Sequence, residues 1–170
     1  MSDFIMGRIN SLEVKDPKEL SQSEVRRMLM SIKDKVSSHP KAVFGGTPEC
    51  DNGMFPLEHT FADGCYIRRI FMPKGSIVVS KIHKTKHPYF ILKGDVSVLT
   101  EKGVVRLSAP YNGITEAGTQ RVLYMHEDTV WCTCHLNPDN KQDVKKIEDR
   151  IIAKSYDELD CIHPAIGEVK

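Results

Sequence analysis

Hydrophobic residues near the amino terminus recur at the three- and four-residue spacing of an amphipathic helix. Ser21 and Glu24 precede this stripe in the arrangement of a capping box, and His39-Pro40 ends it because a residue before proline is pushed out of the helical region. The pattern therefore predicts a helix between these signals with one apolar face. That face comprises Val25, Met28, Leu29, Ile32 and Val36.

From residue 57 onward the hydrophobic period changes to two, which is typical of β-strands. Turn signals such as Asp63-Gly64, Lys93-Gly94-Asp95 and Asn112-Gly113 separate the short apolar runs. Many short strands at this spacing indicate a sandwich or a barrel. We expect strands near 57–61, 65–72, 76–83, 88–93, 95–100, 104–107, 121–126 and 129–135.

A second helix is predicted from about residue 140, with Asp139 or Asn140 as its cap, and one further turn at 156–159. The fold class is therefore mainly β, an antiparallel barrel flanked by an N-terminal and a C-terminal helix. We expect a single compact domain, since each helix needs the barrel to cover its apolar face. Its parts are an arm, helix and loop over 1–56, the barrel over 57–136, and a helix and tail over 137–170.

Composition narrows the functional classes. The 170 residues include 24 basic and 23 acidic side chains, so no global field favours nucleic acid or a membrane surface. There is no apolar run of eighteen residues and no secretory signal at the amino terminus. Five scattered cysteines in such a chain favour reduced thiols in a cytosol-like compartment.

The segment 75–94 carries the main candidate chemistry, with His83 and His87 at a polar turn between two predicted strands. Lys81 shares a face with His83, and Arg121 can face them from an opposite strand. Two cations beside two imidazoles suit an anion, such as phosphate or a carboxylate, as well as they suit a divalent metal.

A Zn, Fe or Mn site on His83 and His87 would need a third ligand, for which His59, His126 and Glu127 are candidates. Lys81 and Arg121 would then bind an anion or an acidic substrate. Alternatively, the histidines hydrogen-bond within a blocked barrel and bind nothing.

The same segment resembles the first motif of the cupin family of double-stranded β-helix, or jelly-roll, barrels. That motif runs glycine, five residues, His-x-His, three or four residues, glutamate, six residues, glycine. Aligned on Gly94, Lys81 and His83 fall on its two histidines. His87 takes the place of its glutamate, so the glycine framework matches better than the ligand set.

The second cupin motif is also only partly matched, and the resemblance covers about residues 57–136. Gly118 matches its glycine, whereas Arg121 replaces its histidine and Met125 its asparagine. The chain is more similar to cupin-like proteins encoded by tailed bacteriophages. That likeness is carried by HTFADGCYIRRIFMPKG, KIHKTKHPYFILKGDVSV and AGTQRVLYMHEDTVW.

The resemblance implies a phage-encoded, non-enzymatic virion or accessory module located in the host cytoplasm or the virion. Its expected partners are other phage subunits or copies of itself. The alternatives are a metal-dependent cupin enzyme acting on a small acidic molecule, and a sugar- or nucleotide-binding barrel. We favour a role without catalysis, because the usual cupin ligands are incomplete.

Cys132 and Cys134 are predicted to share one face of a strand. Such a pair could chelate a soft metal or oxidise. Small residues of this kind are also common in cores, and packing is the simpler interpretation.

Overall fold

The amino-terminal helix forms as predicted and packs on a β-barrel. The computed structural model describes residues 22–100 and 103–162, and Ser21 of the expected capping box lies outside them. Helix α2 spans Gln22–Ser37. Its apolar stripe is buried against Leu99 and Val122 of the barrel.

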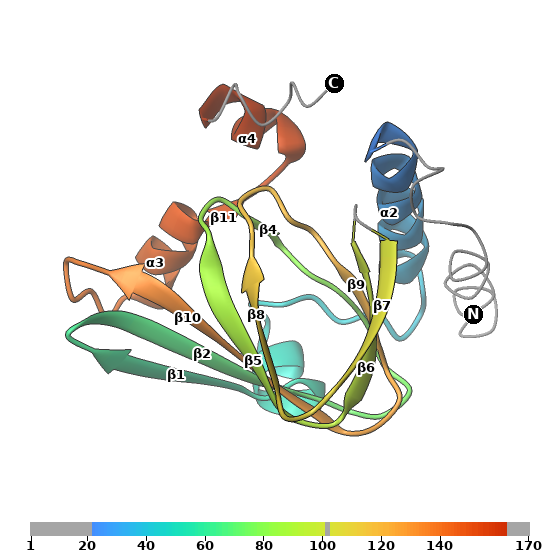
Figure 1. Cartoon of the computed structure of the whole chain (residues 1–170), viewed down its shortest axis with the longest axis horizontal. Helices are drawn as coiled ribbons and strands as arrows, with labels where there is room; N and C mark the ends of the chain where they lie inside the picture. Colours follow the sequence, from blue (N-terminus) through green and yellow to red (C-terminus); the bar gives the residue numbers. More distant parts are fainter. Residues whose placement is uncertain (1–21, 101–102, 163–170) are drawn as a thin grey trace.

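The barrel is built from two antiparallel sheets, drawn facing each other in Figure 1. The larger sheet has the order β1-β2-β10-β5-β8 and the smaller the order β3-β9-β6-β7. A third, two-stranded pair joins β4 to β11. The strands of the larger sheet are β1 (Leu57–Ala62), β2 (Gly64–Met72), β10 (Thr129–Asn137), β5 (His87–Lys93) and β8 (Tyr111–Thr115). The others are β3 (Ile77–Val79), β9 (Val122–Met125), β6 (Asp95–Thr100), β7 (Gly103–Ser108), β4 (Ile82–His83) and β11 (Ile152–Ala153).

The core lies between the two sheets, because alternate residues of each strand point inward. The expected mainly-β, jelly-roll barrel with flanking helices is confirmed. The larger sheet contributes Met72, Tyr89, Ile91 and Trp131, and the smaller contributes Val96, Val98, Leu107, Leu123 and Met125.

One predicted strand and one predicted turn were wrong. The strand expected over 76–83 is interrupted, and its two halves pair with different strands, β9 and β11. The turn expected at Asn112-Gly113 lies inside β8 instead. Glycine occurs there because a Cβ on Gly113 would lie 2.7 Å from the hydroxyl oxygen of Tyr89, so the residue makes room for a ring rather than for a turn.

The first carboxy-terminal helix begins later than predicted. Helix α3 spans Val144–Ile151, and its N-cap is Asp143, whose carboxylate accepts a hydrogen bond from the Lys146 backbone N–H. Asn140, one of the two expected caps, instead adopts a positive φ of 49° and accepts a hydrogen bond from Gly64 of the β1–β2 turn. The further turn is confirmed as α4, Tyr156–Ile162. A π-helical turn, η2 (Cys50–Met54), lies in the predicted loop before the barrel.

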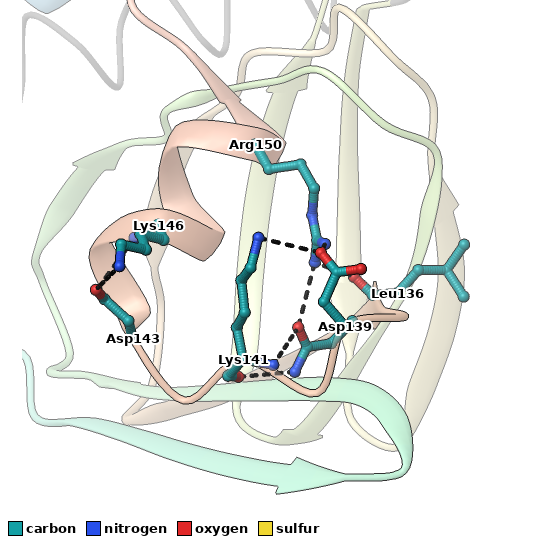
Figure 2. A network of polar contacts seen from close by, with 7 residues as sticks. Leu136, Asp139, Lys141, Asp143, Lys146 and Arg150 are labelled. Atoms are coloured by element: carbon teal, nitrogen blue, oxygen red, sulfur yellow. Dashed lines mark hydrogen bonds and ion pairs between the residues drawn. The ribbon is translucent and has the colours of Figure 1, made fainter.

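A polar network fixes the connection from β10 to α3 (Figure 2). Arg150 donates hydrogen bonds from its guanidinium to the Leu136 carbonyl oxygen at 2.7 Å and to the Asn137 side-chain oxygen at 3.4 Å. The Asn137 amide in turn donates to the Lys141 carbonyl oxygen at 2.8 Å. Because Asn137 is fully buried, these bonds satisfy polar groups that would otherwise be costly and hold the end of β10 in place. None of the described helices is long and apolar enough to span a membrane.

Candidate metal site

Three histidines from three strands meet inside the barrel. His83 lies on β4, His87 on β5 and His135 on β10. The ring centroid of His87 lies 4.4 Å from that of His83 and 4.1 Å from that of His135. One ring nitrogen from each histidine lies within 4.8 Å of the other two. Tetrahedral coordination with bonds of about 2.0–2.1 Å needs nitrogens roughly 3.3 Å apart, so binding would draw the rings slightly together.

Each histidine has a buried ring nitrogen without a hydrogen-bond partner. These atoms are Nδ1 of His83, Nε2 of His87 and Nδ1 of His135. The Nδ1–H of His87 donates to the Thr85 carbonyl oxygen at 2.9 Å, which leaves the lone pair on Nε2. His135 likewise uses Nε2 to contact the Thr133 hydroxyl at 3.1 Å. A backbone or side-chain contact on one nitrogen, with the other left free, is the usual arrangement of a metal-binding histidine.

The three imidazoles are held neutral, which is the form that binds metals. Burial lowers the pKa of His83 to about 2, and repulsion from the two other histidines acts in the same direction. Burial also lowers the pKa of His135 to about 3, assisted by His87. The pKa of His87 is lowered by burial as well, although its bond to Thr85 opposes the shift.

A cavity of about 790 Å³ opens beside the histidines, within the size range of small-molecule sites. His83 and His135 line it, together with the two arginines Arg68 and Arg121. His87, only 3% exposed, is not part of the lining. His83 and His135 therefore border the cavity, while the buried His87 ring packs against both of them.

Both arginines carry charge into the cavity without a carboxylate partner among the described residues. Arg121 is only 6% exposed; its guanidinium donates to the Thr115 hydroxyl at 2.9 Å and lies 5.0 Å above the Tyr89 ring. The backbone N–H of Arg121 also donates to the Ser80 hydroxyl oxygen, which fixes the start of this side chain. Arg68 has a buried Nε without a partner. An uncompensated buried cation is costly, so the region around the Arg121 guanidinium favours an anion. Elsewhere the cavity is also lined by the acidic residues Asp51, Glu148, Asp149 and Glu158.

The structure places the remaining sequence candidates away from this cluster. Lys81 lines the cavity but pairs with Glu148 of α3 at 2.9 Å. His59 contacts the Tyr66 hydroxyl through Nδ1, and His126 contacts Ser97 on the other sheet. Glu127 is exposed in the turn before β10. The structure thus joins His83 and His87 as predicted, but the third histidine is none of the three candidates.

Sequence reasoning missed His135 because the two motifs were aligned on Gly94 and Gly118, and β10 lies beyond both. The sequence nevertheless contained a signal, because inward-facing and outward-facing residues alternate along β10. Trp131, Thr133 and His135 occupy its inward face. A histidine in the inward register of a buried strand is a candidate for the barrel interior.

The cysteines of β10 do not pack in the core, contrary to the simpler expectation. Cys132 and Cys134 alternate with the buried residues and are half-buried on the outer face of the larger sheet. Cys65 of β2 lies on the same face, with its sulfur 3.1 Å from that of Cys134. All four described cysteines, including the buried Cys50, are free thiols.

Comparisons with known proteins give only distant similarities. No protein-family model matches this chain, and no curated protein shows significant sequence similarity to it. Among solved structures, an acetylacetone dioxygenase from Acinetobacter johnsonii is 20% identical with a TM-score of 0.40, over 51% of this chain and 65% of the dioxygenase. This chain therefore spans just under two thirds of that protein's length.

Two further solved structures are similar at the same level. KdgF from Halomonas sp. is 12% identical with a TM-score of 0.45, over 54% of this chain and 84% of that chain. A cupin superfamily protein from Desulfitobacterium hafniense is 13% identical with a TM-score of 0.40, over 47% and 76% of the two chains. Identities this low carry no functional residue from one protein to the other.

Proposed function

We propose that this protein is a metal-dependent enzyme of the cupin type that acts on a small anionic molecule. The observation that carries the proposal is the cluster of His83, His87 and His135 beside the cavity. Each has an unpartnered buried ring nitrogen, and one ring nitrogen of each lies within 4.8 Å of the other two. A barrel that served only as a scaffold would gain nothing from three buried, unpartnered nitrogens, since each unsatisfied polar atom lowers stability. A bound cation would satisfy all three at once.

The donor set fits a divalent first-row metal. Three neutral imidazoles suit zinc or iron, and three protein ligands leave coordination positions open, as in catalytic sites. When bound there, such a metal supplies Lewis acidity to an oxygen atom of the substrate or of water. Thr85 and Thr133 orient His87 and His135, and the burial of these two histidines limits their contact with water.

Arg121 and Arg68 are proposed to bind the anionic part of the substrate. Arg121 is positioned by Thr115 and by the Tyr89 ring, so its guanidinium needs little reordering to receive a carboxylate or phosphate. Arg68 offers its free Nε to the same cavity. Both cations would also stabilise negative charge that develops on the substrate during reaction. Lys81 was expected in this role, but its pairing with Glu148 makes Arg68 the better candidate.

Calorimetric titration of the metal-loaded protein with oxalate and with inorganic phosphate tests the anion site. Arg121→Gln and Arg68→Gln should each weaken binding of the preferred anion at least tenfold. Lys86→Gln is the matched control, because Lys86 is exposed and pairs with Glu116 at the surface. Equal binding by all four proteins would contradict the assignment of the arginines.

The phage-encoded scaffold role stays a prediction, as do contacts with phage subunits or with a second copy. The virion role can be tested separately, since a virion component must be present in purified particles. Mass spectrometry of intact particles that lacked this chain would exclude the virion role and leave the enzyme proposal unaffected.

A further inference from the structure

The sulfur atoms of Cys65 and Cys134 lie 3.1 Å apart on the outer face of the larger sheet. A disulfide bond is about 2.0 Å long, so the two atoms are roughly 1 Å from bonding distance. Both side chains are half-buried rather than enclosed, and a small reagent can reach them. Cys132 lies on the same face of β10 but makes no such contact with Cys65.

We infer that Cys65 and Cys134 form an oxidisable thiol pair that closes into an intramolecular disulfide by exchange with a low-molecular-weight disulfide of the glutathione class. In the first step the Cys65 thiolate attacks one sulfur of the small disulfide, its S–S bond breaks, and one small thiolate leaves. In the second, the Cys134 thiolate attacks the Cys65 sulfur of the mixed disulfide and releases the second small thiolate. The two protons that the cysteines give up are taken up by the two released thiolates, so the protein is oxidised by two electrons and the small disulfide is reduced to two thiols.

The strand register indicates that this bond is reversible rather than permanent. Cys65 stands directly opposite Leu136, so Cys134 is its diagonal neighbour on β10. Diagonal neighbours in antiparallel pairs have Cα atoms about 7–8 Å apart, beyond the usual 4.4–6.8 Å of disulfides. Closure must therefore pull β2 and β10 together. A disulfide that is strained in this way is easily reduced, which is typical of labile rather than structural bonds.

The location of the pair gives the modification a direct structural consequence. Successive residues of a strand point to opposite faces, so Cys134 lies outside while the adjacent His135 lies in the barrel. Tyr66, the neighbour of Cys65, packs against the His135 ring at 6.0 Å between centroids. The cross-link would thus join the two strands immediately behind this histidine.

The test is oxidation of the reduced full chain by oxidised glutathione, followed by alkylation, intact-mass measurement and peptide mapping. The parent and every variant in this experiment carry Cys161→Ser, so that this fifth cysteine does not contribute to the thiol count. We expect the loss of two hydrogen atoms, the loss of two alkylatable thiols, and a linked peptide containing Cys65 and Cys134. Excess reduced glutathione should restore both thiols.

Single variants separate this pair from other thiols. Cys65→Ser and Cys134→Ser should stop at a stable mixed disulfide with glutathione, whereas Cys132→Ser should close as the parent does. A cross-link through Cys132, or mixed disulfides in the parent that never close, would overturn the inference. Thiol counting does not depend on metal, so its outcome is distinguishable from failure of the proposed function.

Discussion

At the residue scale, three histidines that stay neutral make the metal-free protein sensitive to acid. The pKa of His135 is about 3 and that of His83 about 2, whereas an unfolded chain returns both toward the ordinary value of 6.5. Below pH 6.5 the unfolded chain therefore binds protons that the folded protein does not. By linkage, the stability present above that pH is lost progressively as the pH falls toward the folded pKa values.

We predict that the free energy of unfolding of chelator-treated protein declines between pH 7 and pH 5. Each histidine that stays neutral contributes a slope of up to about 1.4 kcal/mol per pH unit once the pH is below 6.5. His135→Gln should reduce this slope, while His39→Gln, which changes a histidine outside the barrel, should not. Urea unfolding at several pH values measures it, and a flat profile for the parent protein would contradict the burial of neutral rings.

Individual site residues were only partly predictable from the sequence. His83 and His87 are four positions apart, so they were recognisable as a pair at one predicted turn. His135 is separated from them by some fifty positions and is brought to them by the pairing of β10 with β5. Arg121 was expected at the site, whereas Arg68 was not among the sequence candidates. Which inward-facing residues converge depends on strand order, and no local pattern encodes that order.

At the element scale, the β5–β6 turn depends on the absence of a side chain at Gly94. Its φ is +100°, and a Cβ there would lie 2.4 Å from the Thr129 hydroxyl oxygen and 2.7 Å from the Asp128 carbonyl oxygen. Gly46 has a similar φ of +92°, but nothing lies within 4 Å of the corresponding Cβ position. Substitution at Gly46 therefore tests backbone strain alone, whereas substitution at Gly94 tests backbone strain together with close packing.

Gly94→Ala should destabilise the protein by more than Gly46→Ala. The second change carries only the conformational cost of roughly 1–2 kcal/mol for a left-handed backbone, whereas the first must also displace the start of β10. Thermal or urea unfolding of both variants gives the comparison. Equal losses would show that β10 does not approach Gly94 as closely as described.

Helix α2 should stabilise the barrel through its buried stripe. Leu29 is fully buried, so Leu29→Ala is expected to cost about 2–5 kcal/mol of unfolding free energy. Met30, the next residue, is 53% exposed, and Met30→Ala should cost under about 0.5 kcal/mol. Urea unfolding distinguishes them, and similar small losses would mean that the helix does not dock on the smaller sheet.

The helices and strands themselves were largely predictable, because each has its own spacing of hydrophobic residues and its own turn or capping residues at its ends. Helix α2 and most strands of both sheets follow directly from the spacing of apolar residues. The failures arose where tertiary contacts override local signals. Gly113 serves the Tyr89 ring rather than a turn, and the short pair of β4 with β11 depends on a partner some seventy residues away.

At the scale of the whole molecule, the two sheets converge at one end and diverge toward β4 and β11 (Figure 1). The hydrophobic core occupies the space between the sheets, and the cavity extends to the segment that carries His83. The helices contribute to this arrangement as well, since Glu148 of α3 pairs with Lys81 beside the cavity. A rigid frame of this kind can hold three imidazoles close together while leaving one side open to a ligand.

Metal content after loading is the most direct test of the central claim. Chelator-treated protein would be incubated separately with zinc, ferrous iron and manganese, desalted, and measured by elemental mass spectrometry. The parent and His126→Gln, which changes a histidine in the turn between β9 and β10, should retain about one equivalent of at least one metal. His135→Ala should retain none despite an unchanged circular dichroism spectrum. A parent protein that retained no metal, or a His135→Ala variant that retained as much as the parent, would contradict the three-histidine site.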